Sequence, residues 1–205
     1  MVYPGKSSGR QTIFIKSIFK NVKNNETLSP IFRVALVLGG ARSGKSRYGL
    51  SLAERFPAPR LFLATGEARD EEMVARIAAH QAERGPDWET QEEPLDLPEA
   101  VRAGQGRYGA ILVDCLTMWL ANLMLREEVS EEDLKAAGQR LLTTLDRVTT
   151  PTIFVSNEVG LGIVPESPLS RKYRDWLGWL HQQVARAADL VVLVVAGLPL
   201  ALKGK

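Results

Sequence analysis

Residues 34–46 read VALVLGGARSGKS, which is the most informative part of the sequence. Its first five residues are apolar, and the rest fits the phosphate-loop (P-loop) pattern G-x-x-x-x-G-K-[ST] through Gly39, Gly44, Lys45 and Ser46. The glycines let backbone amides turn toward phosphate oxygens, the lysine brings a positive charge to the β- and γ-phosphates, and the serine offers a hydroxyl to Mg²⁺. A glycine turn with a surface lysine would explain the motif alone. It would not explain the strand before the motif and the helix predicted after it, at residues 45–55, so we predict a nucleoside triphosphate site.

The rest of the chain repeats this alternation of strand and helix. The other apolar segments are short, rich in Val, Ile and Leu, and lack strict alternation, as in strands covered on both faces. They lie at 60–64, 110–113, 152–155 and 190–195. Helical patterns lie at 70–81, 116–125, 131–147 and 170–187, the third with Ser130 as its N-cap. We therefore predict an α/β fold of the P-loop NTPase type: a doubly wound, mostly parallel sheet with helices on both faces.

In such sheets ligands bind beyond the carboxyl ends of the strands. Asp114 stands at one of these ends, where it either holds Mg²⁺ or caps the next helix. We expect Ser46 and Asp114 to end adjacent strand–loop units and to share one Mg²⁺. The segment 157–165 follows another strand, and it either forms a loop over the site or simply connects two elements.

Composition limits the classes of partner. Residues 1–30 carry a net charge of +4, which leaves −2 on the rest of the chain, so the body has no general attraction for nucleic acid. The single cysteine, Cys115, excludes an internal disulfide and suits a reducing compartment. No apolar run approaches the roughly 20 residues that span a bilayer. We expect a cytoplasmic protein without a membrane span.

The first 33 residues differ from the rest, with Gly, Ser, Asn and Lys around one brief apolar patch. They lack the apolar core and cleavage site of a secretory signal. An upstream start codon, a cloning remnant and a mobile tail all explain them. We expect residues 1–33 to be a disordered or non-native extension without function, and 34–205 to form a single P-loop catalytic domain.

The chain has two histidines, which differ in context. His181 lies in an amphipathic helical pattern, which indicates a packing or surface position. His80 ends the predicted helix 70–81, which begins after the ligand-facing end of the second strand. From the residues alone it is either an ordinary helix C-terminal histidine, favoured by the helix dipole, or a catalytic group.

The chain from Val34 onward resembles the bifunctional adenosylcobinamide kinase/adenosylcobinamide-phosphate guanylyltransferase family. The resemblance covers nearly all of residues 34–197. It rests on these stretches: GGARSGKSR, LFLATGEARDEEMVARIAAHQAERGPDW, VDCLTMWLANL, SNEVGLGIVPESPLSRKYRDWLG and VVLVVAG.

The resemblance implies a catalytic role for His80, the only histidine in the matching block. In this family a histidine at that place attacks the α-phosphate of GTP and carries GMP as a phosphoramidate, which is nucleophilic catalysis by imidazole. Lys45 is the second catalytic residue. Glu92 is a candidate for reading guanine. The nucleotide-binding residues implied are Gly39, Gly40, Ala41, Arg42, Ser43, Gly44, Lys45, Ser46, Ala64, Thr65, Gly66, Gln81, Ala82, Glu83, Arg84, Glu92 and Asp114.

The reaction implied has two stages. ATP or GTP phosphorylates the aminopropanol hydroxyl of adenosylcobinamide, and GMP is then transferred from GTP to give adenosylcobinamide-GDP. The implied partners are the corrinoid, the nucleotides with Mg²⁺ and other copies of the chain, because homo-oligomers are usual in the family. Two other functions stay open: a monofunctional small-molecule kinase, and a nucleotide-dependent switch, although the Asp-x-x-Gly stretch of switch GTPases does not follow Asp114.

Overall fold

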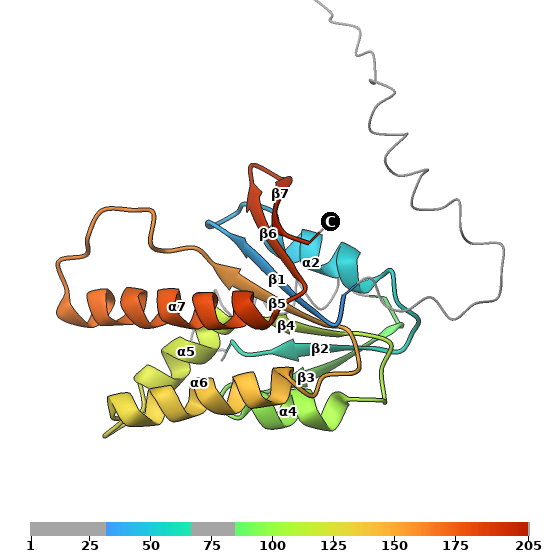
Figure 1. The fold of residues 1–205 in the computed structure, drawn as a ribbon, viewed down its shortest axis with the longest axis horizontal. Helices are drawn as coiled ribbons and strands as arrows, with labels where there is room; N and C mark the ends of the chain where they lie inside the picture. The colour runs from blue at the N-terminus through green and yellow to red at the C-terminus, as the bar shows by residue number, and fades with distance from the viewer. Residues whose placement is uncertain (1–31, 67–84, 205) are drawn as a thin grey trace, which may run out of the picture. The chain divides into compact units, whose positions relative to one another are not determined.

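The computed structural model describes residues 32–66 and 85–204, and in this part of the chain seven strands form one sheet (Figure 1). The strands are β1 (Val34–Gly39), β2 (Arg60–Ala64), β3 (Trp88–Glu92), β4 (Ile111–Asp114), β5 (Thr152–Asn157), β6 (Leu190–Val195) and β7 (Leu198–Lys203). The helices are α2 (Lys45–Ala53), α4 (Leu97–Gly104), α5 (Leu116–Met124), α6 (Glu131–Leu145) and α7 (Pro168–Ala187).

The strand order is β3-β2-β4-β5-β1-β6-β7. Every neighbouring pair is parallel except β6 and β7, which form an antiparallel hairpin. After β1 the chain skips two strand positions in the sheet before it forms β2. The later strands β5 and β4 occupy the two skipped positions. The strand order therefore reverses beside β1, and such a reversal opens a crevice at the carboxyl ends of the strands. The predicted doubly wound, mostly parallel sheet is confirmed.

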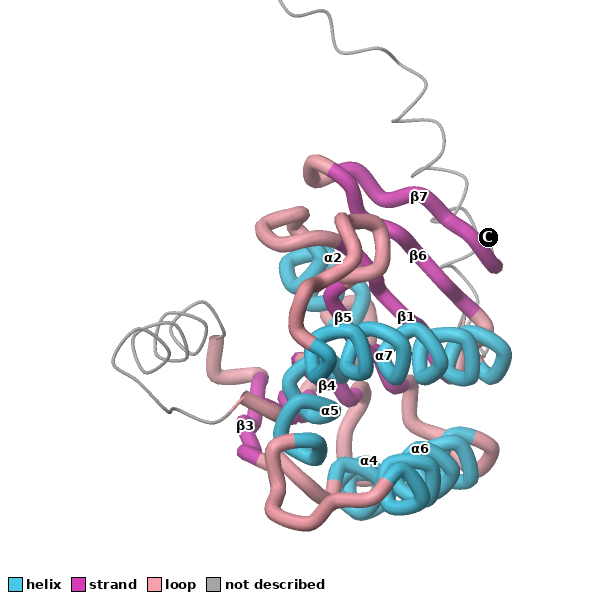
Figure 2. The backbone as a smooth tube through the Cα atoms, turned by 90° about the vertical axis from the view of Figure 1, so that its left-hand side faces the viewer, coloured by secondary structure: helices cyan, strands magenta, loops and turns pink. Residues whose placement is uncertain are grey.

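Alternate residues of the central strands enter two apolar cores, one on each face of the sheet. In β1, Val37 belongs to the core that also holds Leu52 of α2, whereas Leu36 belongs to the core that holds Leu177 of α7. Figures 1 and 2 show α2 on one side of the sheet and α4, α5, α6 and α7 on the other. Because both faces are covered, the strands read as unbroken apolar runs in the sequence.

All five strands predicted from the sequence are present, and four of the five predicted helices fall in the described residues. The helix predicted at 70–81 lies outside them. Boundaries differ by one or two residues: β5 continues to Asn157, α2 ends at Ala53 and α6 ends at Leu145. The predicted N-cap is confirmed, because Ser130 and Asp133 form a reciprocal capping box. Three elements were not predicted, namely β3, α4 and β7.

The predicted extension overlaps the body by two residues. Phe32 is buried and meets Phe56 edge to face, with ring centroids 5.5 Å apart. The backbone amide of Arg33 donates to the carboxylate of Asp189 at 2.7 Å, at the start of β1. These contacts place residues 32 and 33 with the folded body. Residues 1–31 lie outside the described part of the chain.

Candidate active site

The phosphate-loop motif joins β1 to α2 in a tight turn. Gly44 has φ +94°, which favours glycine, and α2 begins at the next residue without a side-chain N-cap. The first amides of α2 therefore face the end of the sheet without competition from a capping side chain. The ammonium of Lys45 donates to the carbonyl oxygen of Gly40 at 3.1 Å, so the side chain folds back over the loop. This turn has the backbone shape and charge that hold phosphate.

The turn between β6 and β7 supports the phosphate loop from the side. Ala196 and Gly197 both have positive φ, at 51° and 79°. The amide of Gly197 donates to the carbonyl oxygen of Ser43 at 2.8 Å. A Cβ built on Gly44 would lie 3.3 Å from the Cα of Gly197, so the two backbones are close. Gly197 and Ser43 are far apart in the sequence, so no local pattern predicts this contact.

The strand that carries Asp114 is not next to the phosphate-loop strand. β5 lies between β4 and β1, with Asn157 opposite Gly39 and Val155 opposite Asp114. The expectation that Ser46 and Asp114 end adjacent strand–loop units is therefore wrong for the strands. The cause is the crossover from β1 to β2, which leaves places for two later strands. Sequence order alone does not reveal which strands fill them.

The segment that follows β2 is held by buried hydrogen bonds. Thr65 Oγ1 donates to the carbonyl of Cys115 at 2.6 Å and accepts from its amide at 2.7 Å. Asn122 of α5 donates to the carbonyl of Thr65 at 2.7 Å and to that of Pro94 at 3.2 Å. The side chain of Thr65, which follows β2, is thus hydrogen-bonded to the backbone of Cys115, which follows β4. The signal for Asn122 was a lone amide inside the apolar helix LTMWLANLM.

Cys115, the residue after Asp114, has a buried thiol. Burial raises the pKa of its thiol to about 11, so the thiol stays protonated at neutral pH. It lies in the apolar core on the α2 face of the sheet. Cys115 is thus a buried packing residue.

Glu92 ends β3, the strand at the opposite edge of the sheet from β7. It stands opposite Ala64 in the parallel register with β2, and its side chain is exposed. The carboxyl ends of β2 and β3 therefore place Ala64 and Glu92 side by side. His80, Gln81, Ala82, Glu83 and Arg84, which the resemblance also assigned to the site, lie outside the described residues.

A chain of polar side chains begins at the end of β5 and enters the interior. Ser156 is fully buried, and its Oγ lies 3.0 Å from Thr117 Oγ1 of α5 and 2.7 Å from Nε2 of His181 on α7. The backbone amide of Asn157 donates to Thr117 Oγ1 at 2.7 Å. Nδ1 of His181 lies 3.9 Å from a carboxylate oxygen of Glu158.

His181 is therefore a buried residue that packs in the interior and also makes a hydrogen bond, and it is not a surface residue. The residue is only 7% exposed. Its spacing from Leu177 and Val184, on the buried stripe of α7, was the sequence signal for burial. Burial lowers its pKa to about 4, and the nearby Glu158 carboxylate offsets this only in part. The imidazole is neutral at physiological pH.

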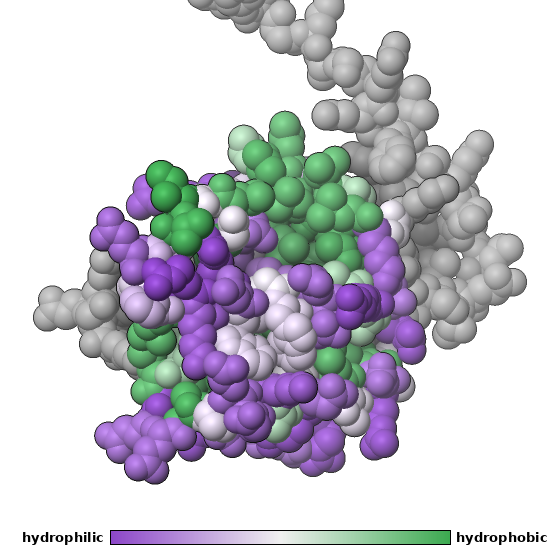
Figure 3. All heavy atoms as spheres, turned by 60° about the vertical axis from the view of Figure 1, so that its left-hand side comes forward, coloured by the Kyte–Doolittle hydropathy of each residue, from purple (hydrophilic) through white to green (hydrophobic). Residues whose placement is uncertain are grey.

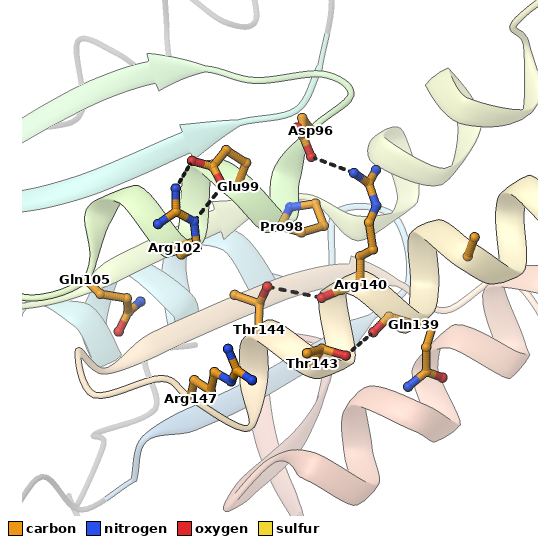
Figure 4. Close-up of a pocket in the computed structure, with 11 residues that line it drawn as sticks. Asp96, Pro98, Glu99, Arg102, Gln105, Gln139, Arg140, Thr143, Thr144 and Arg147 are labelled. Carbon is orange, nitrogen blue, oxygen red and sulfur yellow. Dashed lines mark hydrogen bonds and ion pairs between the residues drawn. The ribbon is translucent and has the colours of Figure 1, made fainter.

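A hollow of about 540 Å³ lies elsewhere, between α4 and α6 (Figure 4). Four of its charged side chains form two pairs: Arg102 bonds to Glu99, and Arg140 lies 3.6 Å from Asp96. The hydroxyls of Thr143 and Thr144 donate to carbonyls of their own helix. No phosphate-loop residue lines it. The site of interest remains the carboxyl edge of the sheet.

Two searches of the described residues bear on metals and membranes. In residues 32–66 and 85–204, no group of three or more His, Cys, Asp and Glu side chains is placed to hold a metal ion. None of the helices there is long and apolar enough to cross a membrane.

Residues 35–202 match the family model described as cobinamide kinase / cobinamide phosphate guanyltransferase. The bifunctional adenosylcobalamin biosynthesis protein CobP of Pseudomonas aeruginosa is 46% identical over 170 residues, which cover 83% of this chain and 97% of that protein. The bifunctional adenosylcobalamin biosynthesis protein CobU of Escherichia coli is 37% identical over 179 residues, which cover 82% and 98%.

Among solved structures, an ATPase from the type III secretion system of pathogenic bacteria is similar in fold, with a TM-score of 0.50 and 12% identity. The match covers 82% of this chain, which spans little more than half of that ATPase, at 56%. At this identity the likeness concerns the fold alone.

Proposed function

The chain belongs to the cobinamide kinase / cobinamide phosphate guanyltransferase family, and we propose that one nucleotide site at the carboxyl edge of its sheet serves both reactions. The protein is thus a transferase of cobalamin biosynthesis with two activities. The observation that carries the proposal is the phosphate loop at the reversal of strand order, within a match that spans residues 35–202. The substrates are a corrinoid and nucleoside triphosphates.

In the kinase stage, ATP or GTP phosphorylates the aminopropanol hydroxyl of adenosylcobinamide. Phosphoryl transfer depends on positioning and charge stabilisation. The amides of residues 39–46 bind the phosphates, and Lys45 neutralises charge on the β- and γ-phosphates. The bond from Lys45 to Gly40 supports this role, because it already places the ammonium over the loop.

The residues at this edge fit a magnesium ion. Mg²⁺ prefers oxygen ligands, and it keeps several water molecules and binds substrate phosphates alongside one or two protein groups. Ser46 lies in the first turn of α2 and Asp114 is the last residue of β4, both at the carboxyl edge of the sheet. Both are donors of the required type. Bound there, the ion would neutralise charge on the phosphates.

In the guanylyl stage, His80 attacks the α-phosphate of GTP and releases pyrophosphate. The phosphate of adenosylcobinamide phosphate then takes GMP from the histidine. The family resemblance supports this role for His80, which itself lies outside the described residues. Contacts to the nucleotide come from residues 64–66, residues 81–84 and Glu92. The side chain of Thr65 already bonds to the backbone of Cys115. The role we assign to Thr65 is therefore to hold this segment in place.

Labelling with GTP tests the guanylyl stage. The full chain with Mg²⁺ should take up label from the α-phosphate of GTP but not from the γ-phosphate, and should release pyrophosphate. The protein-bound label should be lost in acid and stable in base, as for a phosphoramidate. His80→Ala should lose the label and all guanylyl transfer, yet still phosphorylate cobinamide. Label in His80→Ala, or a label mapped to His181 or to a lysine, would refute the intermediate.

We also infer that the chain acts as a homo-oligomer. Figure 3 shows hydrophobic side chains gathered over β6 and β7, where the exposed members are Val195, Leu198, Leu200 and Leu202. An exposed apolar patch on an edge strand favours association. Two tryptophans of α7, Trp176 and Trp179, contribute less, since they already pack against the core. Leu200→Lys should lower the mass measured by light scattering. An unchanged mass would show that β7 is not part of the subunit interface.

A further inference from the structure

The polar side chains around Ser156 have no part in the mechanism given so far. They link three elements: Thr117 at the start of α5, Ser156 and Glu158 at the end of β5, and His181 in α7. Thr117 and Ser156 are buried, and so is His181. Buried polar groups that bond to one another fix a local geometry. At the outer end of the cluster, Nδ1 of His181 lies 3.9 Å from a carboxylate oxygen of Glu158, whose side chain is 24% exposed.

One direction of hydrogen bonding along this chain puts a proton toward Glu158. The backbone amide of Asn157 donates to Thr117 Oγ1, and either hydroxyl of Thr117 and Ser156 can donate to the other. With Ser156 as the donor to Nε2 of His181, the one proton of the neutral imidazole lies on Nδ1, the nitrogen that faces Glu158. The opposite tautomer would turn a lone pair of Nδ1 toward the carboxylate.

Glu158 also has a fixed place beside the phosphate loop. Its amide donates to the carbonyl oxygen of Gly39, the first glycine of the motif, at 3.0 Å. One carboxylate oxygen accepts from the amide of Gly160, and the other faces His181. β5 lies between the phosphate-loop strand and the strand of Asp114. A carboxylate is thus anchored between the lysine and the acid that the kinase stage uses.

The two stages differ in their need for such a group. In the kinase stage the nucleophile is a neutral hydroxyl, and an acceptor must take its proton as the new O–P bond forms. The guanylyl steps use a neutral imidazole and then a phosphate anion. Each attacks with a free electron pair, and neither needs to lose a proton first. A base at this edge is required for one stage only.

We propose that Glu158 is the catalytic base of the kinase stage and that His181 is its positioning residue. This rests on the proposed function above. The oxygen of the substrate hydroxyl bonds to the γ-phosphorus while the bond to the β-phosphate oxygen breaks. The hydroxyl proton passes to the Glu158 carboxylate, and the electron pair of the broken bond leaves with the nucleoside diphosphate.

The test measures both stages on the same variants of the full chain. Glu158→Gln keeps an oxygen that can accept from Gly160 but removes the base, and Glu166→Gln changes an exposed acid of the following loop. We expect Glu158→Gln to lower kcat of cobinamide phosphorylation by about 10² to 10⁴-fold. KM for cobinamide and labelling by α-labelled GTP should stay near wild type. Glu166→Gln should match wild type in both assays.

A double-mutant cycle tests His181. His181→Phe should lower kcat of the kinase in the wild-type background, and His181→Gln, which keeps an amide donor, should restore part of it. In the Glu158→Gln background His181→Phe should have no further effect on kcat.

A kinase rate within threefold of wild type in folded Glu158→Gln would overturn the proposal, and so would equal loss of both activities. Additive effects in the cycle would overturn the role of His181. If the wild type takes no label from GTP, the proposed guanylyl stage fails instead. The kinase assay still tests Glu158.

Discussion

The amide of Gly197 donates a hydrogen bond to the carbonyl oxygen of Ser43, 2.8 Å away, and so joins the β6–β7 turn to the phosphate loop. The two residues are 154 positions apart in the sequence. The contact makes the shape of the loop depend on a hairpin at the far end of the chain. It also fixes the side of the loop that borders Gly44.

Gly197→Ala should therefore weaken nucleotide binding. Gly197 has φ +79°, so an alanine there is strained by about 1–2 kcal/mol even though space is open around its Cβ. Gly106→Ala is a matched control, with φ +73°, open space and an amide that also donates a hydrogen bond. Both variants should lose similar stability in urea unfolding. Only Gly197→Ala should raise KM for GTP. Equal KM values in the two variants would show that the hairpin does not influence nucleotide binding.

Lys45→Ala should strongly lower kcat of both activities and leave the fold intact. The lysine lies at the start of α2 and over the loop, so its main effect is on the charge that the phosphates meet. Loss of one such charge costs on the order of 10²–10³-fold in kcat. Lys135→Ala, on the exposed face of α6, is the control. Turnover near wild type in folded Lys45→Ala would remove the loop from the mechanism.

Asp114→Asn should lower both activities by several kcal/mol of transition-state stabilisation, of the order that a bound metal supplies. The change keeps the size of the side chain and removes its charge. Titration of kcat with Mg²⁺ should also show a higher metal requirement. Asp146→Asn, at the C-terminus of α6, serves for comparison. A crystal structure with Mg²⁺ and a GTP analogue in which Asp114 is more than one water away from the metal would contradict the assignment.

The sequence predicted those parts of the fold that depend on local pattern. The central strands are apolar on both faces, and the phosphate loop needs a fixed set of residues in a row. β3 escaped prediction because WETQE lies at a sheet edge with four exposed residues. β7 escaped because an antiparallel return through Ala196-Gly197 lacks the usual Asn-Gly turn signal. The short α4 does carry a start signal, Pro98 in its first turn, which was missed.

The site was less predictable than the fold, because its geometry comes from contacts between distant segments. The strand ends predict that ligands bind at the carboxyl edge of the sheet. They did not reveal that β5 separates Asp114 from the phosphate loop, nor that Ser156 bonds to His181. Periodicity shows that His181 faces inward, but its hydrogen-bond partner depends on how α7 lies on the sheet.

The pH dependence of stability should report on His181. Its pKa is about 4 in the folded chain and near 6.5 when unfolded, so between these values the unfolded chain binds more protons. Stability therefore rises with pH across this window and is lost as the pH falls from about 6.5 toward 4. The shift corresponds to about 3 kcal/mol. His181→Gln removes this titration while His80 stays in both proteins. Urea unfolding of the two proteins from pH 7.5 to 4.5 should show the free energy of wild type falling more steeply. Parallel curves would mean that folding does not lower the pKa of His181.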